Sequence, residues 1–88
     1  METRVALIAI IVEHEKSIEV LNSILHDYSK YIIGRMGIPY AKRGISIISI
    51  AIDAPQDIIS ALAGKLGKIE GISVKTAYSN VKGPKNKE

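Results

Sequence analysis

The 88-residue chain lacks the residues on which several kinds of chemistry depend. It has no cysteine, which excludes disulfides, thiolate metal sites, cysteine-ligated iron–sulfur clusters and a cysteine nucleophile. Tryptophan and phenylalanine are also absent, so four tyrosines supply all of the aromatic area. Stability must therefore come from aliphatic burial, for which a hydrophobic content of 47% is ample.

Long apolar runs are missing as well. The apolar segment 5–12 is far shorter than the roughly 20 residues that a membrane-spanning helix requires. The charged segment 13–16 follows it directly, without the small-residue cleavage site of a signal peptide. We therefore expect a cytoplasmic protein with no membrane contact.

The net charge of +3 is a weak indication of nucleic-acid binding because of where the charge lies. Segment 82–88 carries three lysines and one glutamate, a net charge of +2, which leaves only +1 for the rest of the chain. A basic footprint on the folded surface is therefore not evident. We expect residues 80–88 to be a disordered, Lys-rich tail and residues 1–79 to form one domain.

Two segments, 5–12 and 45–52, are apolar or small on both of their alternating faces. A strand with one face in water alternates apolar and polar residues, whereas a strand covered on both faces is apolar almost throughout. We interpret 4–12 and 45–52 as the central strands of a sheet. Because so short a chain with two helices can cover only one sheet face, something else should cover the other.

The remaining segments complete an alternating order of strands and helices. Residues 14–30 have helical spacing of apolar side chains, and residues 31–38 are strand-like but carry two glycines, which suits an edge strand. Pro39 should end that strand, with a loop over 39–44. Pro55 suits the first turn of a second helix, with Asp53 or Ala54 at its cap, and residues 72–78 form the last strand.

This βαββαβ order predicts an α+β, ferredoxin-like sandwich. Its antiparallel sheet has the strand order 4-1-3-2, with both helices on one face, so the two doubly apolar strands take the central positions. The helix-free face should then pair with a second copy of the chain, as a dimer or tetramer. The expected interface residues are Leu7, Ala9, Ile45, Ile47, Ser49 and Ala51. On the first strand the opposite set, Ile8, Ile10 and Val12, is equally apolar and could face the partner instead.

Catalytic and metal-binding patterns are not recognisable. His14 and His26 stand twelve residues apart, which does not match the i, i+3 or i, i+4 spacing of metal ligands on a helix. No nucleophile and base occur in a familiar context, so we predict no enzyme activity, no metal and no cofactor.

One cluster could bind a small anionic effector. Arg35, Tyr40, Lys42 and Arg43 surround glycines in the segment 34–44, a composition that can hold an anion through side chains and backbone N–H groups. The alternative reading is a bulged edge strand and a solvated loop whose charges discourage edge pairing.

Particular residues also carry a resemblance to a known family. The segments Tyr31-Ile-Ile-Gly-Arg-Met-Gly-Ile-Pro-Tyr40, Gly44-Ile-Ser-Ile-Ile-Ser49, Asp53-Ala-Pro55 and Ile59-Ser-Ala-Leu-Ala-Gly-Lys-Leu-Gly67 resemble a small bacterial family described as regulators of iron-only hydrogenase systems. That family is similar to ACT-type ferredoxin-like domains and to the ligand-binding domain of nickel-responsive repressors. The resemblance implies a non-enzymatic, oligomeric, ligand-sensing regulatory domain. The alternative is a transcriptional regulator that binds DNA itself through an assembled basic surface.

Overall fold

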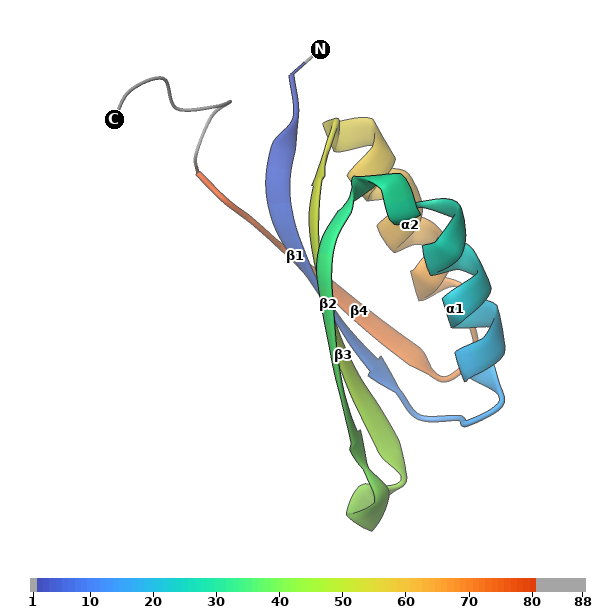
Figure 1. Ribbon diagram of the computed structural model, residues 1–88. Helices are drawn as coiled ribbons and strands as arrows, with labels where there is room; N and C mark the ends of the chain where they lie inside the picture. The colour runs from blue at the N-terminus through green and yellow to red at the C-terminus, as the bar shows by residue number, and fades with distance from the viewer. Residues whose placement is uncertain (1, 81–88) are drawn as a thin grey trace.

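A four-stranded antiparallel sheet with two helices on one face makes up the computed structural model, which describes residues 2–80 (Figure 1). The strands are β1 (Arg4–Val12), β2 (Ile32–Tyr40), β3 (Ile45–Ala54) and β4 (Ile72–Tyr78), and the helices are α1 (Ser17–Asp27) and α2 (Gln56–Gly67). The strand order β2-β3-β1-β4 is the predicted order 4-1-3-2 counted from the opposite edge. The ferredoxin-like sandwich is therefore confirmed. Residues 81–88 of the expected tail lie outside the described part.

The core lies between the sheet and the helices. Alternate residues of the central strands, among them Ile8, Ile10, Ile50 and Ile52, are fully buried there. The helices contribute apolar side chains at helical spacing, namely Leu21 and Leu25 from α1 and Ile59, Leu62 and Leu66 from α2. Full burial of one such aliphatic side chain contributes about 1.5–3 kcal/mol, so this shared core is the main source of stability.

The β2–β3 hairpin differs from the expectation. Pro39 does not end β2, because the strand continues to Tyr40 and Pro39 pairs with Ser46 of β3. An edge strand tolerates proline, since one side of its backbone needs no ladder hydrogen bond. A short 3-10 helix over Ala41–Arg43 then closes the hairpin, and Gly44 adopts a left-handed conformation with φ of 68°.

The helix starts also differ. α1 begins at Ser17 rather than near His14, and the Ser17 hydroxyl donates a hydrogen bond of 2.7 Å to the Glu70 carbonyl instead of capping the helix. Asp53 and Ala54 remain in β3, so neither caps α2, whose N-cap is Pro55.

Candidate functional site

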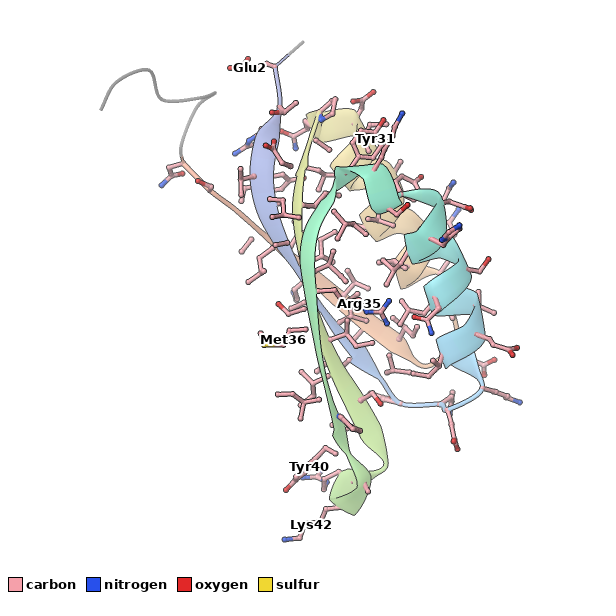
Figure 2. All side chains as sticks on the ribbon, in the orientation of Figure 1. Glu2, Tyr31, Arg35, Met36, Tyr40 and Lys42 are labelled. Atoms are coloured by element: carbon pink, nitrogen blue, oxygen red, sulfur yellow. The ribbon has the colours of Figure 1, made fainter. Side chains whose placement is uncertain are left out.

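The sheet face opposite the helices, called the open face below, carries most of the exposed large apolar side chains. In the described part of the chain eight large hydrophobic residues are exposed, and strand alternation places six of them on this face. These six are Val5, Leu7, Met36, Ile38, Tyr40 and Ile47. Figure 2 shows Met36 and Tyr40 pointing away from the helices. A concentration of this kind differs from ordinary scattered exposure and is the pattern that interaction surfaces typically show.

The centre of the open face is free of charge. Ala9 pairs with Ser49, Leu7 with Ala51, and Ile11 with Ile47, so small side chains lie between larger aliphatic ones. The charged residues that alternation places on this face within the paired strands are Asp53, near one end, and Lys75, which is the β4 neighbour of Ala9 and borders the centre. A flat, apolar centre with charges toward its rim is the composition of a protein interface core and rim.

The expected interface residues all lie on the open face. Ile8, Ile10 and Val12 of β1 face the helices and are buried, so the alternate set with Leu7 and Ala9 faces outward. On β3 the same alternation turns Ile45, Ile47, Ser49 and Ala51 outward. That a second chain covers these residues stays a prediction.

The four residues expected to hold an anion do not converge within one chain. Arg35 points toward α1 (Figure 2), where its Nη2 donates a hydrogen bond of 2.6 Å to Asn22 Oδ1. Tyr40 lies on the open face, five residues further along the same strand. Lys42 and Arg43 lie in the 3-10 turn at the hairpin end. The structure thus keeps Tyr40, Lys42 and Arg43 near one another and separates Arg35 from them.

An open groove of about 790 Å³ lies between the start of α1 and the far end of the β2–β3 hairpin. Residues from three parts of the chain line it: Val12, Glu15, Lys16, Ile18, Glu19, Pro39, Tyr40, Ala41, Gly44, Ile45 and Ser46. This groove is not predictable from the sequence, because its two walls, residues 12–19 and 39–46, are at least 20 residues apart along the chain. The lining mixes aliphatic side chains with two carboxylates and one ammonium group.

The histidines lie apart from this groove. The His14 ring packs on Gly71, where an added Cβ would come within 2.3 Å of the His14 Cδ2 atom. The backbone N–H of Glu13 also donates to the Gly71 carbonyl, so the β1–α1 and α2–β4 loops are joined. Among residues 2–80 no three His, Asp or Glu side chains come close enough to hold a metal ion. No helix in that part of the chain is long and apolar enough to cross a bilayer.

The topology and the helix-free sheet face define a domain of the ferredoxin-like class. The same fold occurs in a formyltetrahydrofolate deformylase from Pseudomonas putida KT2440, with a TM-score of 0.59 and 16% sequence identity. That match covers 89% of this chain and only 29% of the deformylase, so the likeness concerns the fold alone.

The chain belongs to the TM1266-like family, described as "Iron-only hydrogenase system regulator, putative", and the family model matches residues 4–76. It is similar to the uncharacterized protein TM1266 from Thermotoga maritima, with 37% identity and a TM-score of 0.84. That alignment covers 88% of this chain and 98% of TM1266. No curated protein matches the chain. The resemblance noted in the motifs is thereby confirmed.

Proposed function

We propose that the protein is a non-enzymatic regulator in an iron-only hydrogenase system, working in the cytoplasm as a homo-oligomer. The family membership supports the regulatory role. The open face carries the structural part of the proposal, because it presents an uncharged centre that a second copy of the same face can cover. In a two-fold arrangement the same patch lies on both sides of the interface, so it must complement itself.

Self-complementarity is supported by the residue pairs in the centre of the open face. The central pairs Ala9–Ser49 and Leu7–Ala51 leave shallow positions beside the larger Ile11 and Ile47. A second sheet turned by 180° would place its large side chains over these small ones. An uncharged surface of this kind has no preference for a basic or an acidic partner, which favours a second copy over a charged macromolecule.

The proposal includes a small anionic effector that shifts the assembly. Lys42 and Arg43 at the hairpin end are its best contacts, since Arg35 already binds Asn22. Inorganic phosphate is a suitable probe because it presents several acceptor oxygens to such donors. We expect millimolar phosphate to raise the melting temperature of the wild type and of Arg35→Ala but not that of Arg43→Ala. Equal shifts in all three proteins would remove the effector from the proposal.

The whole proposal is tested in the organism that makes the protein. Native mass spectrometry of the protein isolated from that host should report an even multiple of the chain mass and any retained small molecule. Replacing the gene by an Ile47→Lys allele should change hydrogenase transcript level or activity as strongly as deletion does. A monomer at micromolar concentration, together with unchanged hydrogenase in the deletion strain, would refute the proposal.

Direct DNA binding through an assembled basic surface is the alternative. Phosphate contacts release counterions, so such binding weakens steeply as salt rises. Gel shifts with the promoter region of the hydrogenase genes, repeated at increasing salt, separate the two readings.

A further inference from the structure

The groove beside α1 points to a second contact between copies, distinct from the open face. We propose that it receives the hairpin tip, residues 40–44, of another copy, so that two chains exchange their hairpins. The inference deepens the proposed self-association and rests on it. It concerns the helix side of the sheet, whereas the open face lies on the other side.

The hairpin is shaped to reach a neighbouring molecule. Val12, the last residue of β1, pairs with Ser46, so residues 40–45 extend beyond the neighbouring strand. Figure 1 shows this end of the hairpin projecting past α1. The groove lies on the helix side of this projection. Val12 and Ile18 line one wall, and the chain's own hairpin forms the other wall through Pro39 and residues 40, 41 and 44, so an incoming tip would lie between α1 and that hairpin.

Charge is divided between the groove and the hairpin in a complementary way. Between residues 28 and 52 the chain has four cations, two of them Lys42 and Arg43, and no acidic residue. Segment 13–19 instead has three glutamates and one lysine, a net charge of −2 with neutral histidine. Of these residues Glu15, Lys16 and Glu19 line the groove with a net charge of −1, and all three are exposed. The basic tip of one copy therefore matches the acidic wall of another.

Such a contact can be two-fold symmetric, with each chain giving its tip to the other and receiving the other's tip. Two hairpins lying antiparallel on their helix-side surfaces place each tip at the α1 start of the other chain. The helix-side surface of the hairpin is open at Gly37, where an added Cβ would meet only the Ile48 side chain, at 3.9 Å. Each chain then has two self-complementary surfaces on opposite sides of one sheet. Two different two-fold contacts whose axes cross at right angles generate a closed tetramer, whereas one gives a dimer.

A charge-swap experiment tests the contact with the full-length protein. The tip variant carries Lys42→Glu and Arg43→Glu, and the groove variant carries Glu15→Lys and Glu19→Lys. All four side chains are exposed, so both variants should fold. Each variant alone places like charges at both exchanged contacts. The mixture pairs a negative tip with a positive groove, and a positive tip with a negative groove.

We expect each variant alone to have half of the wild-type mass in native mass spectrometry and the equimolar mixture to recover the full mass. The hairpin contact should weaken by roughly tenfold or more at 0.1 M salt, where the screening length is about 10 Å. Wild-type mass in both separate variants would overturn the inference. So would a tip variant that loses DNA binding while its mass is unchanged, because the tip would then serve a nucleic acid.

The Ile47→Lys variant separates this inference from the open-face proposal. If both contacts exist, Ile47→Lys and the charge variants each convert tetramers to dimers. If only the open face associates, Ile47→Lys gives monomers and the charge variants keep the wild-type mass. If only the hairpins associate, the charge variants give monomers and Ile47→Lys has no effect. A monomeric wild type would refute both.

Discussion

Replacing Ile47 by lysine is the sharpest test of the open face. Ile47 lies on a central strand, next to Ile11 on β1 and Ile38 on β2, and its side chain is 39% exposed in the single chain. A lysine there keeps its stem against these neighbours and extends its ammonium group outward. The fold of one chain should therefore survive, at a cost of about 1 kcal/mol.

The effect on association follows from the same exposure. Full burial of an isoleucine contributes about 1.5–3 kcal/mol, so covering the exposed 39% contributes about 0.6–1.2 kcal/mol for each copy. Loss of this burial energy from both copies raises the dissociation constant of a two-fold dimer roughly 10- to 50-fold. Each lysine also brings a charge into an apolar interface without a partner, which costs several kcal/mol more. Together the changes should weaken the open-face contact by at least roughly three orders of magnitude.

Light scattering coupled to gel filtration measures the change. We expect the Ile47→Lys protein to lose half of the wild-type mass and to keep its circular dichroism spectrum. Val20→Lys is the matched control, because Val20 is an exposed aliphatic residue on α1, away from the open face. The control should keep the wild-type mass. Equal masses for all three proteins, or dissociation of the control as well, would refute the reasoning.

Two further predictions concern stability and use urea unfolding. Ser17→Ala removes the 2.7 Å hydrogen bond to the Glu70 carbonyl and should lower the unfolding free energy by about 1 kcal/mol. Ser23→Ala on the exposed side of the same helix should change it by less than about 0.5 kcal/mol, and equal effects would contradict the assignment. Gly71→Ala should cost about 1–3 kcal/mol, since φ is 79° and the new methyl group meets the His14 ring. Adding His14→Ala to the Gly71→Ala protein should restore only the part of the unfolding free energy that was lost to the steric clash. Full recovery of the wild-type unfolding free energy would exclude backbone strain at residue 71.

The strand order could be predicted because local pattern and topology agree. Segments 5–12 and 45–52 are apolar on both faces, and a βαββαβ chain has only two central strand positions. Element ends were predicted less well. The local sequence does not indicate that α1 begins at Ser17. The Ser17 hydroxyl donates a hydrogen bond to the Glu70 carbonyl, and only the folded chain brings these two residues together. Pro39 was expected to end β2 even though that strand was expected at an edge, where a proline can remain within the strand.

The expected anion site shows a similar limit. A loop over 39–44 would have left Tyr40 free to approach Arg35. Because β2 continues to Tyr40, the period of two along a strand fixes these residues on opposite faces of the sheet. The extension of β2 by two residues beyond the expected end therefore separates the Arg35 and Tyr40 side chains, which are close in sequence. The groove at α1 could not be predicted at all, since its lining comes from segments that meet only in the folded chain.

The sequence by itself determined the fold, the family and the presence of more apolar surface than two helices can cover. Composition and periodicity are local properties, and they are enough to say which segments must be buried on both faces. Tertiary structure alone decided which β1 residues face outward, how the cations are divided, and that an acidic groove lies beside a projecting basic hairpin. These depend on strand register and on contacts between distant segments, which are set by packing of the whole chain rather than by any one stretch of it.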